Sequence, residues 1–411
     1  MSSVQLSAFL EARMGANRLW FAKRLAANDT LATRAHQAGP YFPKPVMFRL
    51  FPELERSDKK NPDVKVAANV QGEELADPIR GVWYNSKVYG GGTRNECRFT
   101  NFGGQSSPVL NEDSTGSVAL FSFLMGAAGS AVDVDIWVCV DPDEDEEIES
   151  RIGEVLPGSG VFWRYSEHFL PEFIHFGTVT REASCQLPVE KIPPEWFAKF
   201  PTGVEIFDRV LSLRPCKGLN ADRALIKRRN CEFQLFQSVE EATTLPLIRD
   251  GFASLDEFLS VSHTVLQRRK SRSGRSLELH LRRVFEENGL VEGDGFDHGK
   301  TSEGNKKPDF LFPSAAAYRD ETFPAEKLRM LGVKTTCKDR WRQVVTEADR
   351  IAVKHLLTLQ EGVSVAQFAE MRAKNIQLVV PAAHVKRFPK EIRADLQTVQ
   401  SFIDETRAIF A

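Results

Sequence analysis

The sequence lacks any C-x-x-C pair, any glycine-rich phosphate-binding motif and any large excess of charge. Its six cysteines are widely scattered, which argues against a zinc module and a disulfide scaffold and fits a reducing cytoplasm. The missing G-x-x-x-x-G-K-[S/T] loop argues against a phosphotransfer enzyme. The formal net charge is −2, from 54 Lys and Arg against 56 Asp and Glu, so a site for a polyanion must be a local patch.

The sequence also lacks a convincing membrane segment. The uncharged run at 114–132 approaches the length of a membrane span, but its serines and glycines are typical of a strand followed by a turn. The amino-terminal residues include Glu11, Arg13 and Arg18, which favours an amphipathic helix over a secretory signal. We therefore expect a cytoplasmic protein that makes no contact with a membrane.

A length of 411 residues favours two domains, because a single hydrophobic core stops growing below this size. The first part contains short β-like runs bounded by turn residues, which predicts an antiparallel barrel or sandwich. These runs lie at 46–51, 64–70, 79–84, 97–102, 118–124 and 134–140. The acidic run at 141–149 is interpreted as the start of a helix near Asp143 and not as a metal cluster, because acids complement the positive end of a helix.

The second part alternates helical and strand patterns, which predicts a layered α/β domain. Helical patterns occupy 254–266, 276–288, 341–357, 365–373 and 389–409, and strand patterns occupy 310–312, 328–333 and 376–380. Prolines at 188, 193 and 194 are typical of a linker, so the boundary is expected near residue 185. The predicted division is a first domain at 1–180, a linker at 181–195 and a second domain at 196–411.

The most informative residues are Asp309, within Lys-Pro-Asp-Phe-Leu-Phe-Pro at 307–313, and Lys334, which follows it by 25 residues. Side chains alternate along the strand before Lys334, so Lys334 shares one face with Met330 and Gly332. An acid that enters an apolar strand supplies a ligand for a hard cation, and a neighbouring lysine can contact a phosphate. This combination predicts a nuclease that uses a divalent metal.

Nucleases of the PD-(D/E)-x-K group normally carry a second carboxylate two residues before the lysine, where this chain has Gly332. One aspartate is a poor ligand set for Mg²⁺, so another carboxylate must contribute. Glu278 lies at the edge of an apolar helical stripe and can point inward. Glu347 follows Lys334 by 13 residues, on the helix expected there, and by itself it is read as a solvated acid paired with Arg350. The residues leave both candidates open.

Several segments closely resemble the EcoRII family of restriction endonucleases. They are 276–281, 303–314, 328–343 and 359–364, together with 27–30, 36–37 and 93–96 near the amino terminus. The resemblance implies a homodimer that cleaves double-stranded DNA at 5′-CC(A/T)GG with Mg²⁺ and leaves 5′-phosphates. It also implies a carboxy-terminal endonuclease-like domain, an amino-terminal B3-like barrel that binds a second copy of the site as an effector, and a companion DNA cytosine methyltransferase.

The resemblance assigns roles to the residues of the predicted site. Asp309 and a carboxylate from Glu278 or Glu347 would hold the metal, and Lys334 would contact the scissile phosphate and the attacking water. Related enzymes that act on CCGG take the second carboxylate from the helix after the lysine, which favours Glu347. Tyr318 is read as a structural residue and not a nucleophile, because nothing nearby would activate it.

The resemblance also implies how the DNA is recognised. Lys338, Asp339 and Arg340 would read C·G pairs, because lysine and arginine donate to guanine O6 and N7 and aspartate accepts from cytosine N4. The central A·T pair would be flipped out of the helix. The basic run at 268–275 would contact phosphates without reading sequence. Its expected contacts are Arg268, Arg269 and Arg272.

In the first domain, two arms at 28–37 and 94–98 would enter a groove of the effector DNA. Their expected contacts are His36, Arg94, Glu96 and Arg98. Cys97 stands where the family leads us to expect lysine, and Arg34 and Ala35 stand where glycines are expected. His36 is not predicted to bind a metal, because no second ligand stands at metal-site spacing.

A second hypothesis is a sequence-specific DNA-binding regulator on the same scaffold with a decayed catalytic centre. A pure binding protein has no need of the intact set formed by Glu278, Asp309, Lys334 and Glu347. That set therefore favours the nuclease.

Overall fold

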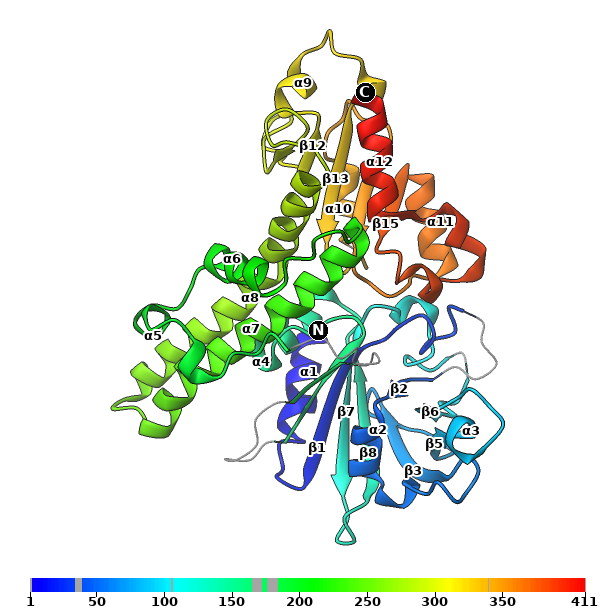
Figure 1. Ribbon diagram of the computed structural model, residues 1–411. Helices are drawn as coiled ribbons and strands as arrows, with labels where there is room; N and C mark the ends of the chain where they lie inside the picture. Colours follow the sequence, from blue (N-terminus) through cyan, green and yellow to red (C-terminus); the bar gives the residue numbers. More distant parts are fainter. Residues whose placement is uncertain are drawn as a thin grey trace. The chain divides into compact units, whose positions relative to one another are not determined.

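The computed structural model describes residues 2–33, 39–104, 106–164, 172–175, 184–338 and 340–410. The chain divides into two compact units, which are drawn in Figure 1. Unit 1 consists of Met1–Val179, Gln360–Ala369 and Lys386–Ala394, and unit 2 consists of Thr180–Leu359, Glu370–Val385 and Asp395–Ala411. The expected linker at 181–195 begins with residues outside the described part, so its bounds stay a prediction.

Unit 1 contains a ten-stranded sheet in the described residues, with the order β10-β9-β1-β7-β8-β3-β5-β6-β2 and with β4 paired to β3. The strands are β1 (Arg18–Arg24), β2 (Tyr41–Phe42), β3 (Asp63–Val70), β4 (Glu73–Glu74), β5 (Ile79–Tyr84), β6 (Glu96–Thr100), β7 (Val118–Met125), β8 (Ala131–Val138), β9 (Ser159–Trp163) and β10 (Glu172–His175). The β3–β8 pair is parallel and its neighbours in the order are antiparallel. Phe99 of β6 stacks on Phe123 of β7 with ring centroids 5.8 Å apart, although three strands separate them in the order, so the sheet curls around a common core.

The helices of unit 1 are short. They are α1 (Ser2–Glu11), α2 (Lys44–Leu50), α3 (Ser86–Tyr89) and α4 (Pro142–Ile152), with 3₁₀ turns η1 (Pro52–Leu54) and η2 (Glu112–Ser114). The helix expected to begin near Asp143 is confirmed, because α4 begins at Pro142 with a capping box formed by Asp141 and Glu144.

One local prediction for unit 1 is wrong, and strand β1 was missed. The strand expected at 46–51 is part of helix α2, which begins after Pro43 and buries Val46, Met47 and Leu50 on one side. The strand β1 was not predicted, because Lys23 and Arg24 are charged and a sequence with such residues is not expected to be buried. Lys23 pairs with Asp29 at 2.6 Å, and Arg24 pairs with carboxylates of α4, so both cations lie inside the unit.

Unit 2 contains a six-stranded sheet in the described residues, with the order β11-β12-β13-β14-β15-β16. The strands are β11 (Asp297–His298), β12 (Phe310–Phe312), β13 (Arg329–Lys334), β14 (Lys354–Thr358), β15 (Ile376–Val380) and β16 (Gln397–Thr398). The first three pair antiparallel, and β13 to β16 pair parallel. The fold class expected from the sequence, a β-rich domain followed by an α/β domain, is confirmed.

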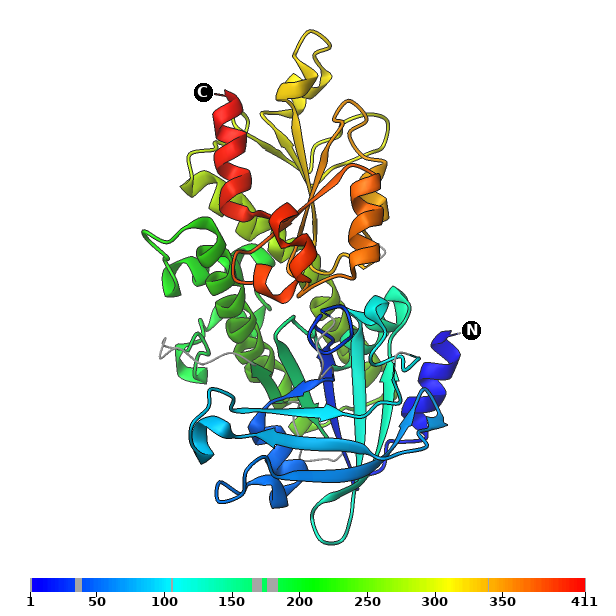
Figure 2. The same cartoon turned by 90° about the vertical axis from the view of Figure 1, so that its right-hand side faces the viewer.

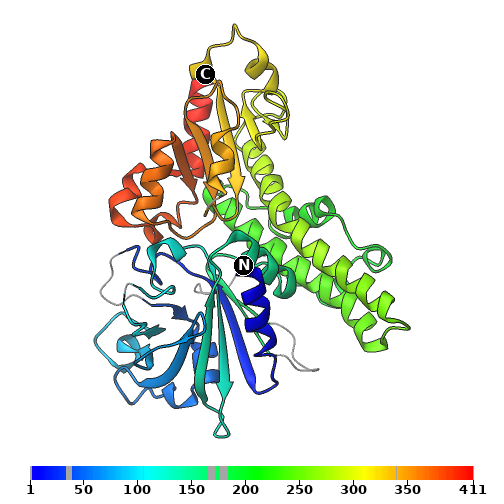
Figure 3. The same ribbon diagram turned by 180° about the vertical axis from the view of Figure 1, so that it is seen from behind.

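Helices cover this sheet and extend beyond it. They are α5 (Glu195–Ala198), α6 (Gly203–Leu213), α7 (Ala221–Asp250), α8 (Leu255–Glu287), α9 (Ala315–Arg319), α10 (Trp341–Val345) and α12 (Val399–Phe410), with 3₁₀ turns η3 (Val189–Lys191) and η4 (Ala325–Lys327). The boundary between the units passes through α11 (Val365–Ala373) and η5 (Val385–Arg387), and η6 (Lys390–Asp395) belongs to unit 1 except for its last residue. α7 and α8 form a long hairpin, which Figure 3 shows from behind. Phe285 of α8 and Phe402 of α12 pack against Phe312 of β12, so both helices lie on one face of the sheet, and Figure 2 shows α12 in red beside it.

The helix expected at 341–357 is wrong. α10 ends at Val345, Ala348 then adopts a positive φ of 51°, and β14 follows at Lys354–Thr358. Every residue of β14 is buried, so the strand shows no alternation between apolar and polar positions. The helix expected at 389–409 begins only at Val399, after η6 and β16. The two helices expected at 254–266 and 276–288 are parts of the single helix α8.

The scattered cysteines did not predict the disulfide between Cys185 and Cys231, which links the beginning of unit 2 to α7. Cys97, Cys139, Cys216 and Cys337 form no disulfide in the described part of the chain. Among the helices of the described ranges, none combines the length and the apolar composition that a membrane span requires.

Candidate active site

Asp309 lies at the entrance to β12, directly before the buried residues Phe310–Phe312. One carboxylate oxygen, Oδ2, accepts a hydrogen bond of 2.6 Å from the backbone N–H of Val333 on the adjacent strand β13. Burial raises the pKa of Asp309, the carboxylate of Glu278 adds to this effect, and Lys334 opposes it. The backbone therefore holds Asp309 in one orientation beside β13.

Lys334 ends β13, and its Nζ lies 3.6 Å from Oδ2 of Asp309. Both side chains are about one fifth exposed, at 22% and 19%. The structure therefore brings together the two residues on which the sequence hypothesis depends. Leu331 and Val333 point to one face of β13 and belong to the core that includes residues of α8. A methyl group at Gly332 would meet Val344 of α10, so Gly332 lies on the opposite face. Lys334 shares that face, because side chains alternate along a strand.

Glu347 lies just beyond α10, where its backbone N–H bonds to the carbonyl of Val344. Burial raises the pKa of Glu347 to about 7, and repulsion from the Asp309 carboxylate contributes in the same direction. Its Oε2 is buried without a hydrogen-bond partner. The reading of Glu347 as an acid paired with Arg350 is not what the structure shows, because the Arg350 guanidinium donates to the carbonyls of residues 318, 320 and 323.

Glu278 lies on α8, close enough to Asp309 to raise the pKa of that carboxyl. Its Oε2 is 2.8 Å from Nε2 of His298, which lies on β11. The imidazole of His298 also packs on the ring of Phe310, with centroids 5.0 Å apart. Sequence reasoning missed His298, because its contact with Glu278 depends on the packing of β11 against α8 and leaves no signal in local spacing.

The donors fit a magnesium ion better than a softer metal. Within the described residues, no group of three or more His, Cys, Asp and Glu side chains is arranged to hold a metal by itself. Mg²⁺ commonly takes one or two carboxylates and completes its shell with waters and substrate phosphate oxygens. Asp309 and the unpartnered oxygen of Glu347 match that requirement. A buried polar atom without a partner calls for an explanation, and a bound cation supplies one.

The residues predicted to read the DNA begin at Lys338, after the three residues that follow β13. Lys338 is buried and Arg340 is half-buried at the start of α10, while Asp339 lies outside the described residues. The segment thus begins shortly after the strand that carries Lys334. The roles of all three residues in base recognition stay predictions.

The basic run at 268–275 was expected just before the helix of Glu278, but it lies inside α8. Its three arginines with predicted DNA contacts face α7 or nearby residues. Arg269 forms an ion pair of 2.6 Å with Glu240, Arg272 lies 4.8 Å from the ring centre of Phe236, and Arg268 lies 4.2 Å from that of Phe200. These contacts secure the hairpin, and phosphate binding by the run stays a prediction.

The predicted effector residues of unit 1 lie on or beside β6. Arg94 stacks on the ring of Tyr84 at 3.8 Å and forms an ion pair of 2.7 Å with Glu96. Arg98 donates to the backbone carbonyls of Asn28 and Gly39, at 3.1 and 2.8 Å, and so connects the two predicted arms. His36 lies outside the described residues.

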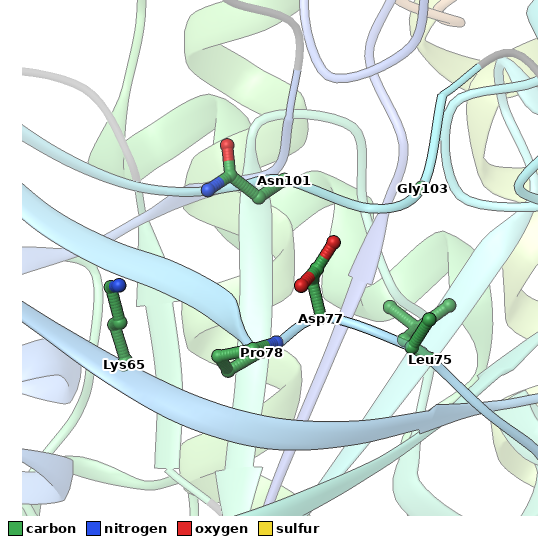
Figure 4. Close-up of a pocket in the computed structure, with 7 residues that line it drawn as sticks. Lys65, Leu75, Asp77, Pro78, Asn101 and Gly103 are labelled. Atoms are coloured by element: carbon green, nitrogen blue, oxygen red, sulfur yellow. The ribbon is translucent and has the colours of Figure 1, made fainter.

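Unit 1 also contains a cavity of about 280 Å³, lined by Lys65 of β3, by residues 75–78 between β4 and β5, and by Asn101 and Gly103 after β6. Figure 4 shows Lys65, Asp77 and Asn101 around it, together with Leu75, Pro78 and Gly103. None of the residues predicted to bind DNA or to act in catalysis lines this cavity. It therefore has no part in the candidate active site.

Comparison with known proteins agrees with the motifs. Residues 15–167 match the family model described as restriction endonuclease EcoRII, N-terminal, and residues 236–403 match the model described as EcoRII C terminal. The chain is 43% identical over 400 residues to the type II restriction enzyme EcoRII of Escherichia coli. That alignment covers 96% of this chain and 95% of the relative.

Two solved structures show weaker similarity. Metal-depleted Ecl18kI in complex with uncleaved, modified DNA aligns with a TM-score of 0.43 and 16% identity, over 54% of this chain and 82% of that chain. The B3 domain of the UbaLAI restriction endonuclease with cognate DNA aligns with a TM-score of 0.28 and 19% identity, over 42% of this chain and all of that domain.

Proposed function

This chain belongs to the EcoRII family of type II restriction endonucleases, and from that premise we propose that it cleaves double-stranded DNA at CC(A/T)GG-like sites with Mg²⁺. The family makes it a DNA phosphodiester hydrolase, so the hypothesis of a regulator with a decayed centre is not retained. The observation that carries the proposed site is the approach of Lys334 to Asp309 at 3.6 Å, beside the unpartnered oxygen of Glu347.

In the proposed mechanism, Asp309 and Glu347 would hold the metal, and Glu278 on α8 would be a further carboxylate near it. Bound Mg²⁺ would lower the pKa of a water molecule and stabilise charge on the phosphate. The N–H of Val333 keeps Oδ2 of Asp309 in place, which leaves Oδ1 of that carboxylate available as a ligand. His298 orients the carboxylate of Glu278 in the same way, through the 2.8 Å contact with Nε2.

Lys334 acts on the substrate in this proposal. Its ammonium group contacts an oxygen of the scissile phosphate and offsets the negative charge that grows as water attacks the phosphorus atom. The bond between phosphorus and the 3′ oxygen breaks, so the products are a 5′-phosphate and a 3′-hydroxyl. When DNA is absent, Asp309 holds the Lys334 ammonium within the site.

The decisive experiment compares the native chain with Lys334→Ala on a duplex that contains CCTGG. We expect the native chain to cut only when Mg²⁺ is present, and sequencing of the ends should place the cut at this site with 5′-phosphates. Lys334→Ala should cut at least 100-fold more slowly, because a lost charge contact to the transition state typically costs this much. Equal rates for the two proteins would contradict the proposed role of Lys334.

We further propose that unit 1 binds a second copy of the site and thereby activates cleavage. The exposed surface of Arg94, whose side chain is 41% accessible, supports a DNA contact on this unit. A plasmid with two sites should then be cut faster than a plasmid with one site. Equal rates for the two plasmids would refute the effector role and leave cleavage itself unaffected.

A homodimer is also part of the proposal. Large apolar side chains are exposed at the end of the α7–α8 hairpin, and we call this group the hairpin patch: Leu247, Ile248, Leu255, Phe258 and Leu259. Clustered exposed apolar residues are typical of a protein interface. A companion cytosine methyltransferase and a prokaryotic host are proposed from the family resemblance alone, and a cytoplasmic location is proposed from the sequence pattern.

A further inference from the structure

A network of hydrogen bonds lies beside Glu347, and the proposed mechanism does not use it. Its centre is Glu303, in the turn that precedes Asp309. Oε1 of Glu303 accepts a hydrogen bond of 3.1 Å from the backbone N–H of Asp349, and Oε2 accepts one from the hydroxyl of Tyr318. Both oxygens of Glu303 are therefore engaged by groups that come from other segments.

Tyr318 extends the network from α9 to the segment after Glu347. Its hydroxyl oxygen accepts a hydrogen bond of 3.3 Å from the backbone N–H of Arg350. Burial raises the pKa of Tyr318 to about 12, and the hydrogen bond to Glu303 acts in the same direction. The hydroxyl therefore stays protonated and donates a hydrogen bond to Glu303. This is typical of a structural tyrosine and not of a nucleophile.

The Arg350 side chain adds further hydrogen bonds to the segment that follows α9. It donates to the carbonyl oxygens of Asp320 and Phe323, at 3.0 and 2.9 Å, and also to that of Tyr318. The two residues that follow Ala348 are thus bonded through backbone N–H groups to the Glu303–Tyr318 pair, and the second of them is also bonded through its side chain.

This attachment matters because Glu347 does not lie on a regular helix. α10 ends at Val345, and the positive φ of 51° at Ala348 turns the chain away from the helix axis. The last backbone hydrogen bond to α10 is that of the Glu347 N–H with Val344, so the position of residues 348–350 depends on contacts with neighbouring segments. Glu303 supplies the acceptors for these contacts from the turn that leads to Asp309.

We infer that Glu303 is a positioning residue, which holds the segment of Glu347 so that this carboxylate stays beside Asp309 and can share a cation with it. The inference rests on the proposed function, because it assumes that these two carboxylates bind Mg²⁺. Glu303 links the segments of the two proposed metal ligands. It precedes Asp309 in the chain, and it accepts a hydrogen bond from the backbone of the segment after Glu347. Loss of such supporting contacts typically weakens metal binding by about 10-fold to 100-fold.

The test compares Glu303→Ala with Glu326→Ala, a control that removes an exposed glutamate from the turn η4 of the same unit. Binding of Mn²⁺ to the full-length protein is measured by electron paramagnetic resonance, as the loss of the free-ion signal. We expect about a 10-fold weaker affinity for Glu303→Ala and no change for the control. The Mg²⁺ concentration that gives half-maximal cleavage should rise in parallel, while DNA binding without metal stays unchanged.

Two further variants separate positioning from general damage. Glu303→Gln keeps an acceptor oxygen and the shape of the side chain, so it should restore most of the Mn²⁺ affinity. In a Glu347→Gln background, Glu303→Ala should weaken Mn²⁺ binding no further, because the ligand that it positions is already lost. Tyr318→Phe should have a smaller effect than Glu303→Ala, since Glu303 then keeps its bond to Asp349.

Each outcome has a distinct meaning. Native affinity in a folded Glu303→Ala protein would overturn the inference, and so would an equal loss in the Glu347→Gln background. Global unfolding of Glu303→Ala, seen by circular dichroism, would assign the network to stability alone and would also overturn it. If the native chain itself neither bound Mn²⁺ nor cut DNA, the proposed function would fail first.

Discussion

A methyl group added at Gly332 would lie 2.7 Å from Cγ2 of Val344, so the face of β13 that carries Lys334 is closed by α10 at this position. The nucleases with the PD-(D/E)-x-K pattern place a carboxylate here. In this chain even the first carbon of such a side chain has no room. The packing of α10 therefore leaves no space for an acidic side chain at position 332. A second carboxylate for the proposed metal site would come from another segment.

This contact gives the first prediction. Gly332→Ala should lower the free energy of unfolding by about 1–3 kcal/mol, because overpacking in a close-packed core forces neighbours to shift. Denaturant unfolding measures the change. Gly203→Ala is the control, since a methyl group at Gly203 meets nothing within 4 Å, and it should have little effect. Equal stability of the two variants would contradict the packing argument.

The second prediction concerns pH and Glu347. Its pKa in the folded protein is raised from 4.5 to about 7, so below pH 7 the carboxyl is largely protonated and a poor ligand. Metal binding should strengthen as the pH rises through 7, and Glu347→Gln should flatten this dependence. Titration of Mg²⁺ into cleavage reactions at several pH values measures it. A native chain whose Mg²⁺ requirement is the same at pH 6 and pH 8 would contradict the assignment.

The same shift has a consequence for stability without metal. The unfolded state loses its Glu347 proton near 4.5 and the folded state loses it near 7, so between these values the folded state binds more protons. Rising pH therefore removes stability across this window. Thermal unfolding in chelator should show this contribution in the native chain and its absence in Glu347→Gln.

The third prediction tests the effector unit. Arg94→Ala removes the guanidinium that stacks on Tyr84 and pairs with Glu96. The ratio of cleavage rates for two-site and one-site plasmids should fall towards one, because the second site is no longer bound. Arg56→Ala, which removes an exposed arginine of the same unit paired with Asp58, should keep the native ratio. An unchanged ratio in Arg94→Ala would exclude this residue from the effector contact.

The fourth prediction concerns the hairpin patch. Phe258→Glu places a charge among apolar side chains that are about half exposed in one chain, so it should shift a dimer towards monomer. Light scattering coupled to size-exclusion chromatography measures the mass. Val291→Glu is the control, because Val291 is exposed at 60% in the same unit but lies outside the patch. A native mass that stays the same in Phe258→Glu would exclude the patch as the interface.

Much of unit 2 could be predicted because its apolar runs are short and bounded by turns. β12 and β15 lie at the predicted residues, and β13 differs by one residue. β14 was missed because it is central, parallel and buried along its whole length, so no alternation distinguishes it from a helix. In unit 1, β1 was missed because buried ion pairs neutralise its Lys23 and Arg24.

Site residues that belong to a sequence motif could be predicted, whereas residues brought to the site only by tertiary packing could not. Asp309 and Lys334 follow from the sequence, since each ends or begins an apolar strand. The role of Glu303 does not, because its contacts with Tyr318 and Asp349 join segments that no spacing rule connects. The same holds for the contact between His298 and Glu278, which forms only when β11 reaches α8.

The helix α8 runs without interruption from Leu255 to Glu287, so the hairpin patch and Glu278 stand on the same rod. At the rise of an α-helix, Leu255 of the patch and Glu278 are about 35 Å apart along α8. The proposed dimer interface and the proposed metal site are therefore connected by one continuous helix.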